Sequence, residues 1–401
     1  MFKKIISKYN DTNLVLRILI GIVIGAILGL FFPKLTLVAL FGDVFVATLK
    51  AIAPVLVFVL VLCAITNSNS SHNSKMRTVI ALYLFSTFLA SLCAVGFSFL
   101  FPQKLVFATS VTNFEYAPQV VGDVMYSILD KIFTNPIKCI IEGYYLGIIF
   151  WSVLLGLSLR KIANQTTKNM LSDFSSSISK VVCQIINLAP FGIMGLVFAT
   201  VCDSGATAFL QYAKVLGLLV VCMFFVYFVT NPLIVFATLH KNPYPLILQC
   251  FRESGITAFF TRSSAANIPV NLALCEKLKL DEQMYSVSIP LGATINMSGA
   301  AVTIAIMSLA AANTLGVAVS FPVALLLSLL ATLCACGASG VTGGSLLLIP
   351  LACSLLGIGD EIAMQVVGIG FIIGVIQDGL ETALNSSSDV IFTATAQYLE
   401  D

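Results

Sequence analysis

Long apolar stretches recur along this chain, and they constrain its fold more than any other feature. The hydrocarbon layer of a membrane is about 30 Å thick, so a helix needs roughly 20 mostly apolar residues to cross it. Six such stretches occupy the first part of the chain, at about 14–32, 44–65, 79–101, 140–159, 181–201 and 215–238. With 58% hydrophobic and 10% charged residues, the composition excludes an ordinary soluble domain. We therefore expect an all-α membrane protein.

Two later apolar segments are interrupted by small and polar residues. Segment 246–275 contains TRSSAANIP, and segment 322–356 contains GASGVTGGSLLLIP. Free backbone N–H and C=O groups cost several kcal/mol each in lipid, so such stretches are tolerated only inside protein or beside a wet cavity. Close packing of small residues between ordinary helices is the alternative explanation.

Each interrupted segment precedes one longer helix candidate, at 285–309 and 361–396. This repetition predicts about eight transmembrane helices plus two re-entrant helical hairpins, arranged as inverted repeats with a binding site at the interruptions. We expect residues 1–238 to form six helices, a scaffold together with some helices of the moving part. Residues 239–401 would form the core transport module.

A polar stripe marks the last helix candidate. Asp378, Thr382, Asn385 and Asp389 are spaced by four, three and four residues, so at 100° per residue they share one face over about 16 Å. Glu381 lies at the edge of this stripe. The alternative is a polar helix that emerges into water.

Positive side chains are scarce near this stripe. No Lys or Arg follows Lys279, and Arg262 in the first interruption is one cation for up to three acids. Charges within a membrane are normally paired, so the remaining negative charge needs either protons or a bound cation. A sodium ion and a ligand ammonium group fit that deficit. Hard cations also need neutral oxygens, which the segment IPLGATINMSGAA at 289–301 offers.

These residues resemble the dicarboxylate/amino acid:cation symporter family, which has the glutamate-transporter fold. The resemblance covers nearly the whole chain and rests on RSS at 262–264, NM-x-G at 296–299 and the D-x-x-x-T-x-x-N-x-x-x-D stripe, with TNP at 134–136. It implies a secondary active symporter that works by alternating access, with Na⁺ as coupling ion and no cofactor. It also implies a homotrimer in the bacterial inner (plasma) membrane.

The resemblance implies specific substrate contacts. Asp378 would hold the amino group of the substrate, and Asn385 its α-carboxylate together with Ser264 and the adjacent Ser263. Thr382 would meet or lie against a substrate hydroxyl, and the backbone of Val341 would close over the ligand. Gating and support would come from the two interruptions, through Arg262, Gly340 and Gly343.

Sodium sites are implied in the same way. One ion would lie between Asp389, Asn385, Asn296 and Gly292, and a second at the backbone of Thr294 and the second hairpin. A possible further site would use Tyr83, Ser86 and Thr87, which match the family pattern, together with Ser298. The Asp usual at that last position is Ser298 here, so fewer ions are expected.

Departures from the family pattern indicate the substrate. Members that carry acidic substrates have Arg one position before the Thr of the stripe, and this chain has Glu381. A bidentate Arg recognises a carboxylate, whereas a Glu repels one. A further Thr near that carboxylate is Ala300 here. We therefore expect small neutral amino acids as substrates, with Glu381 in the substrate site. Serine and threonine are the first expectation, and alanine or another small neutral amino acid is the alternative.

Two other function classes and the topology complete the expectations. GIGD at 357–360 matches a string of intramembrane proteases, but a partner Asp upstream and a PAL motif are missing, so we expect no enzyme and a cap by Asp360. A cation channel lined by acids is the other class.

Basic segments near the N-terminus and at 75–77, 160–168 and 241–252 predict a cytoplasmic N-terminus and, with eight helices, a cytoplasmic C-terminus. A net charge of +2 gives no sign of nucleic-acid binding.

Overall fold

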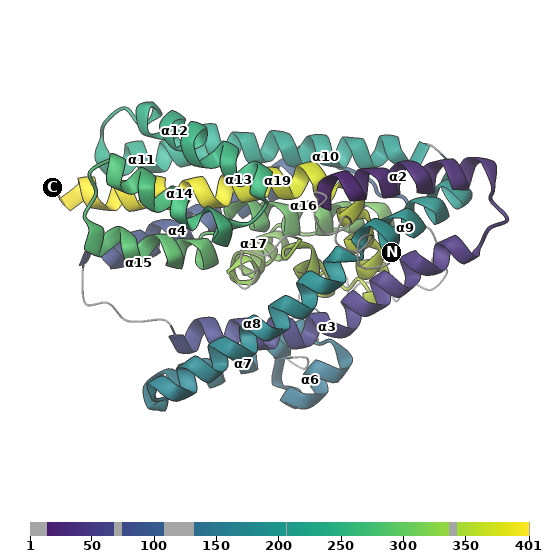
Figure 1. Cartoon of the computed structure of the whole chain (residues 1–401), viewed down its shortest axis with the longest axis horizontal. Helices are drawn as coiled ribbons and strands as arrows, with labels where there is room; N and C mark the ends of the chain where they lie inside the picture. The colour runs from purple at the N-terminus through teal and green to yellow at the C-terminus, as the bar shows by residue number, and fades with distance from the viewer. Residues whose placement is uncertain (1–13, 68–73, 108–131, 206, 337–342, 401) are drawn as a thin grey trace, which may run out of the picture.

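The computed structural model describes residues 14–67, 74–107, 132–205, 207–336 and 343–400, and the helices of Figure 1 account for most of them. The first part contains α2 (Leu14–Phe31), α3 (Leu37–Asn67), α4 (Ser74–Leu100), α6 (Pro136–Glu142), α7 (Tyr145–Ile162), α8 (Gln165–Asn187), α9 (Ala189–Ser204), α10 (Thr207–Phe225), the π-helix η1 (Val226–Thr230) and α11 (Asn231–Leu239). No β-strand occurs in the described ranges.

The second part contains both hairpins and two long helices. It consists of α12 (Tyr244–Cys250), the π-helix η2 (Phe251–Gly255), α13 (Ile256–Thr261), α14 (Ser264–Lys277), α15 (Glu282–Ile295), α16 (Ser298–Leu315), α17 (Phe321–Ala335), the 3₁₀-helix η3 (Leu346–Leu348), α18 (Ile349–Leu355) and α19 (Asp360–Glu400). The predicted all-α fold is confirmed.

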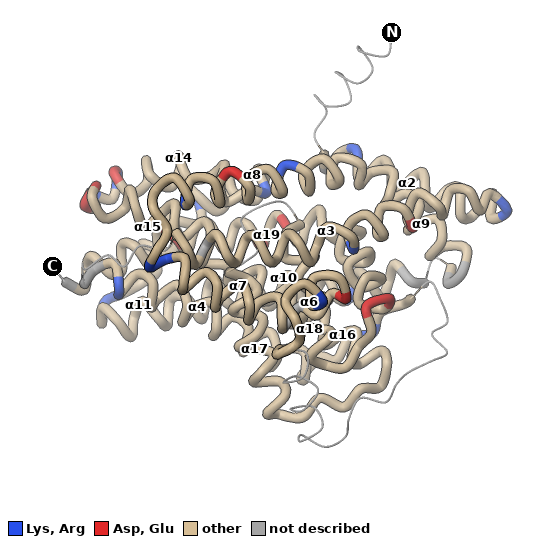
Figure 2. Tube along the Cα trace, turned by 90° about the horizontal axis from the view of Figure 1, so that it is seen from below, with Lys and Arg blue, Asp and Glu red and all other residues tan. Residues whose placement is uncertain are grey.

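Several helices suit a membrane by their length and composition. Among the described residues, five stretches pass this test: Leu37–Asn67, Met76–Leu100, Phe209–Leu239, Glu282–Leu315 and Asp360–Leu399. α8 and α9 form a sixth when counted as one broken span, bent by 51°. The helix expected at 181–201 therefore differs in the structure, because α8 begins at Gln165 and the break lies at Leu188, ahead of Pro190. Pro190 has no N–H to continue the helical hydrogen bonds. Figure 2 shows long uncharged stretches between the charged residues.

The first interrupted segment folds as a helical hairpin. Its first arm comprises α12, η2 and α13, and its second arm is α14. Arg262 adopts the left-handed conformation, with φ 53°, where the chain reverses. Ser263 then accepts a hydrogen bond from the N–H of Ala266 and so caps α14. The RSS sequence thus forms the tip of the hairpin.

The second interrupted segment folds in a similar way. α17 is its first arm, and η3 and α18 form its second arm. Residues 337–342 lie outside the described residues, and the predicted gating residue Gly340 and the ligand-closing Val341 lie among them. Gly343 has φ +72°, a conformation that glycine adopts without steric cost.

The two hairpins enter from opposite ends of α19. The N–H of Asp281, just after the first hairpin, donates to Gln397 near the C-terminus of α19. The second hairpin instead leads through residues 356–359 into Asp360, the first residue of α19. α19 has 41 residues, a length of about 60 Å, and both tips reach Asp378 near its middle. This arrangement agrees with inverted repeats, and Figure 1 shows α19 running through the body of the molecule.

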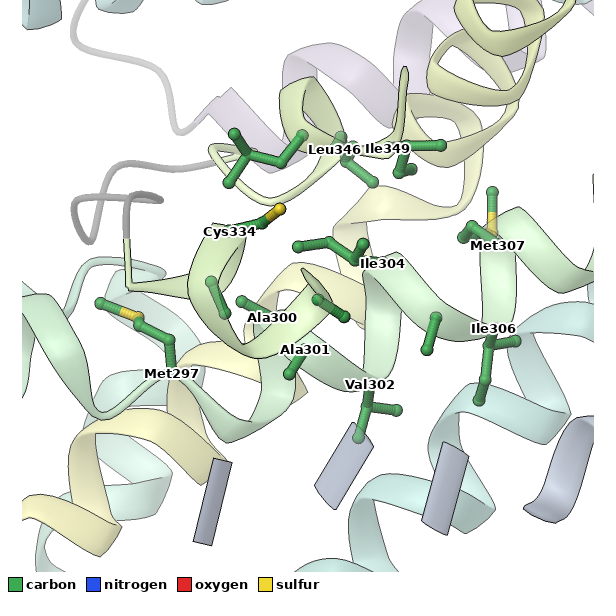
Figure 3. Packing of buried hydrophobic residues seen from close by; sticks show 14 of the residues in the cluster. Met297, Ala300, Ala301, Val302, Ile304, Ile306, Met307, Cys334, Leu346 and Ile349 are labelled. Carbon is green, nitrogen blue, oxygen red and sulfur yellow. The ribbon is translucent and has the colours of Figure 1, made fainter. Parts of the chain in front are cut away.

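The helices pack in two groups. α2 and α3 pack against α7, α8 and α9, whereas α4 and α10 pack against α16 and α19. α16 is buried along Ser298–Ala312. Figure 3 shows Ile304 of α16 directed toward Cys334, Leu346 and Ile349 of the second hairpin. The second hairpin and α16 therefore share one apolar core.

One aromatic pair joins these groups near the second hairpin. Phe45 of α3 and Phe371 of α19 pack edge to face, with ring centroids 5.3 Å apart. A Cβ atom on Gly343 would lie 2.9 Å from the ring of Phe371. Phe371 therefore contacts α3 on one side and the second hairpin tip on the other.

Candidate transport site

The polar stripe of α19 lies inside the protein. The exposed fractions are 3% for Asp378, 6% for Thr382, 3% for Asn385 and 0% for Asp389. A polar helix that emerges into water would expose these side chains, so that alternative does not describe this structure. Each acid needs an interaction partner within the protein or a bound ligand.

Asp378 joins the two hairpin tips. Arg262 Nε donates to Asp378 Oδ2 over 2.7 Å, and the backbone N–H of Gly343 donates to Oδ1 over 3.0 Å. A second guanidinium nitrogen of Arg262 lies 3.4 Å from the carbonyl oxygen of Gly374. The first hairpin thus supplies a cation and the second a backbone N–H to one carboxylate.

Glu381 has a different environment, because its partners are neutral. Thr303 Oγ1 and Ser345 Oγ each donate to Glu381 Oε2 over 2.8 Å, and Gln377 Nε2 donates to the same oxygen. α16 approaches α19 closely here: a Cβ atom on Gly299 would lie 2.8 Å from the Cα atom of Glu381. Only glycine fits this contact.

Asp389 lies beside the break between α15 and α16. The helices are interrupted at Asn296 and Met297, within the segment 289–301. Asn296 Nδ2 donates to Asp389 Oδ1 over 2.8 Å. Asp389 Oδ2 and Asn296 Oδ1 are buried, and neither has a hydrogen-bond partner among the residues that the structure describes. A Cβ atom on Gly292 would lie 2.5 Å from Asp389 Oδ1, so the backbone of α15 borders this carboxylate directly.

Asn385 binds the same helix break. The N–H of Gly299 donates to Asn385 Oδ1 over 2.7 Å, and Asn385 Nδ2 lies 3.3 Å from the sulfur of Met297. Asn296 Nδ2 lies 3.3 Å from the carbonyl oxygen of Asn385. Asn385 therefore connects the Asp378 end of the stripe to the region around Asp389.

The four residues of the possible further sodium site form three separate contacts. Ser86 Oγ lies 3.1 Å from Ser298 Oγ, so these two hydroxyls are in contact. Tyr83 instead donates to the carbonyl oxygen of Asp389 over 3.1 Å. The hydroxyl of Thr87 donates to the carbonyl oxygen of Tyr83 within α4.

Other predicted residues lie at the edges of this region. Ser264 is buried at the start of α14, with 2% of its surface exposed. The hydroxyl of Thr382 donates to the carbonyl oxygen of Asp378 over 2.8 Å. The hydroxyl of Thr294 donates to the carbonyl oxygen of Leu291, so its side chain is directed to its own helix.

Several polar residues of this region were not predicted from the sequence. Asn231 accepts a hydrogen bond from Ser86 over 3.2 Å, at the end of the π-helix η1. Thr303, Ser345 and Gln377 surround Glu381, and Ser388 binds Asn296. A signal for Asn231 exists, because it is a polar residue within an apolar span and follows Thr230 in a second TNP string.

The balance of charge distinguishes the three acids. Within the described part of the chain, Arg262 pairs with Asp378, whereas neither Glu381 nor Asp389 forms an ion pair. Two buried acids therefore have no cationic partner in the described ranges. Buried broken hairpins, an unwound helix and carboxylates of this kind define a secondary transporter of the inverted-repeat type.

Comparison with known proteins agrees with this class. The model of the sodium:dicarboxylate symporter family matches residues 14–399, and the chain belongs to this family. It is 56% identical over 390 residues to a serine/threonine transporter of Bifidobacterium adolescentis. The matched residues cover 97% of this chain and 90% of the relative. Serine/threonine transporters of Streptococcus agalactiae and Streptococcus thermophilus are each 53% identical over 395 residues, 98% of both chains.

Proposed function

We propose that this protein is a sodium-coupled symporter that imports serine and threonine by alternating access. The observation that carries this proposal is the buried, unpaired oxygen of the Asp389 carboxylate. The other oxygen of this carboxylate accepts a hydrogen bond from Asn296, whose own amide oxygen is also buried and unpaired among the described residues. A buried carboxylate without a cation is costly, and a hard cation such as Na⁺ binds carboxylate and neutral oxygens. Rotation of the Asn296 amide group would direct its oxygen toward Asp389.

The remaining sodium ligands follow from the same region. Gly292 and Asn385 border Asp389 and Asn296, and they complete the first proposed site. The backbone of Thr294 and the second hairpin would hold a second ion. A further ion at Ser86 and Ser298 would have only neutral ligands, so we propose that this position contributes less to coupling.

The substrate would bind between the hairpin tips and α19. Its ammonium group would bind Asp378 and replace part of the contact with Arg262, while Asn385 and the first hairpin tip around Ser263 and Ser264 would receive its carboxylate. Glu381 supports a neutral substrate, because it repels the side-chain carboxylate of aspartate or glutamate. The names of the relatives agree with serine and threonine as substrates.

Transport would consist of a rigid movement between the two packing groups. We propose that α4 and α10–α19 move together against α2, α3 and α6–α9. The moving group then includes the helices α4, α10 and α11 from residues 1–238. The second hairpin would act as the gate, since Gly343 permits large backbone changes. Sodium and substrate affinities would be linked reciprocally through Asn385.

Location and assembly follow from the family and the charge pattern. We propose a homotrimer in the bacterial inner membrane with both termini in the cytoplasm, where the basic connecting segments also lie. The protein would transport its substrates without chemical change, as a carrier rather than an enzyme.

Uptake into vesicles tests this function. The purified protein in proteoliposomes should accumulate labelled serine and threonine when a sodium gradient is imposed, and not with an equal potassium gradient. Alanine and aspartate should be taken up less. Counterflow should occur, because a carrier exchanges substrate and a channel does not. Serine uptake that ignores the sodium gradient would refute the proposal.

A further inference from the structure

The two oxygens of Glu381 have unequal surroundings. All three donors, from Thr303, Ser345 and Gln377, reach Oε2. Oε1 accepts no hydrogen bond from the described residues, and it is not among the polar atoms that are both fully enclosed and unpaired. One oxygen is therefore committed to the protein, and the other remains available to a ligand.

The three donors hold this carboxylate from three separate elements. Thr303 belongs to α16, Ser345 precedes η3 in the second hairpin, and Gln377 belongs to α19. Gln377 Nε2 also donates to Thr303 Oγ1 over 2.8 Å, so these side chains hold one another as well as Glu381. Each of these donors is at most 1% exposed, so water does not compete strongly for these bonds.

The position of Glu381 relates it to the proposed ammonium site. Glu381 follows Asp378 by three residues, so the two carboxylates are neighbours on one helical face. The tip of the second hairpin contacts both, through the N–H of Gly343 and the hydroxyl of Ser345. An amino acid whose ammonium group binds Asp378 therefore has Glu381 near its side chain.

We propose that Thr303, Ser345 and Gln377 are positioning residues that direct Glu381 Oε1 to accept a hydrogen bond from the β-hydroxyl group of the bound amino acid. This inference rests on the proposed function. It implies that the subsite for the substrate's side chain accepts a hydrogen bond from a donor group on the β-carbon of the substrate. Serine and threonine carry that donor, alanine does not, and aspartate carries a carboxylate that Glu381 repels. A site built to bind a hydroxyl discriminates against the analogue that lacks it.

Paired uptake measurements test this role. In proteoliposomes with a sodium gradient, KM and kcat are measured for serine and alanine in Thr303→Val, Gln377→Met and the unmodified protein. In each variant the new side chain is similar in size to the original one but has no hydrogen-bond donor. We expect the KM for serine to rise about tenfold, as for loss of one hydrogen bond to a charged group, with the KM for alanine and both kcat values nearly unchanged. Thr303→Ser, which retains the hydroxyl, should restore the preference for serine.

A matched control separates this role from a general effect on structure. The hydroxyl of Thr395 is buried in α19 and donates to the carbonyl oxygen of Ile391 over 2.7 Å, away from Glu381. Thr395→Val should keep the preference of the unmodified protein. Equal losses for serine and alanine in Thr303→Val and Gln377→Met would overturn the inference. The inference would also be overturned if the preference for serine over alanine fell only in Thr382→Val, because Thr382 would then bind the β-hydroxyl group of the substrate.

The design also separates this inference from the proposed function. If the unmodified protein shows no sodium-driven serine uptake, the proposed function is wrong. If sodium drives serine uptake and both variants keep the full preference over alanine, only the role of Glu381 and its positioning residues is wrong.

Discussion

Replacement of Asp389 by asparagine tests the proposed sodium site most directly. Asp389→Asn keeps the size of the side chain and one oxygen, and it removes the charge. Two unit charges 4 Å apart attract by about 4 kcal/mol at an effective dielectric constant of about 20. Part of this is offset, because the variant no longer buries a carboxylate that lacks a cation. We therefore expect the sodium concentration for half-maximal serine uptake to rise about 100-fold or more.

Two measurements check this effect. The first is serine uptake in proteoliposomes as a function of sodium concentration. The second is the thermal stability of the purified protein with and without sodium, because a ligand that binds the folded state stabilises it by mass action. Sodium should raise the Tm of the unmodified protein and leave that of Asp389→Asn nearly unchanged.

A surface variant serves as the control for this test. Asp173 lies on α8 with an exposed side chain, so Asp173→Asn also removes one negative charge but should leave sodium dependence unchanged. If Asp389→Asn shows the same half-saturation and the same sodium-dependent rise in Tm as the unmodified protein, Asp389 is not a sodium ligand and the charge argument is wrong.

Three further substitutions test the substrate side of the site. Asp378→Asn should abolish serine binding at saturating sodium, because the ammonium group loses its carboxylate; retained binding in an equilibrium assay would remove Asp378 from the site. In Glu381→Arg, aspartate should become a stronger inhibitor of labelled substrate uptake and serine a weaker one, although Ala300 lacks the hydroxyl found in members that carry acidic substrates. Unchanged inhibition by aspartate would count against Glu381 as part of the side-chain subsite. Gly343→Ala should weaken serine binding about tenfold, since a left-handed alanine costs about 1–2 kcal/mol and its Cβ meets Phe371; an unchanged dissociation constant would show that the tip does not close over the ligand in this conformation.

Local chemistry made much of the architecture predictable. The apolar stretches required helices, because a backbone in lipid must satisfy its own hydrogen bonds. The small and polar interruptions required protein cover, and both are hairpin regions in the structure. The stripe on α19 followed from helical periodicity alone, and its residues are buried as a group. The bend at Leu188 was not predicted, because composition does not reveal the angle between two helical segments.

Long-range contacts decided which groups surround each acid. The spacing of Asp378, Glu381 and Asp389 identifies a polar face, but it does not reveal that Asp378 receives Arg262 and Gly343 from two hairpins. Likewise, Thr303 and Ser345 meet at Glu381 although 78 and 36 residues separate them from it.

The sequence by itself thus determined the membrane class, most of the helices, the hairpins and the stripe, since each depends on residues close together along the chain. Only the tertiary structure decided which acid is paired, which oxygen is unpaired and which residues hold Glu381. The physical reason is that charge compensation within a membrane depends on distance in space, and the partners come from helices that are distant in sequence.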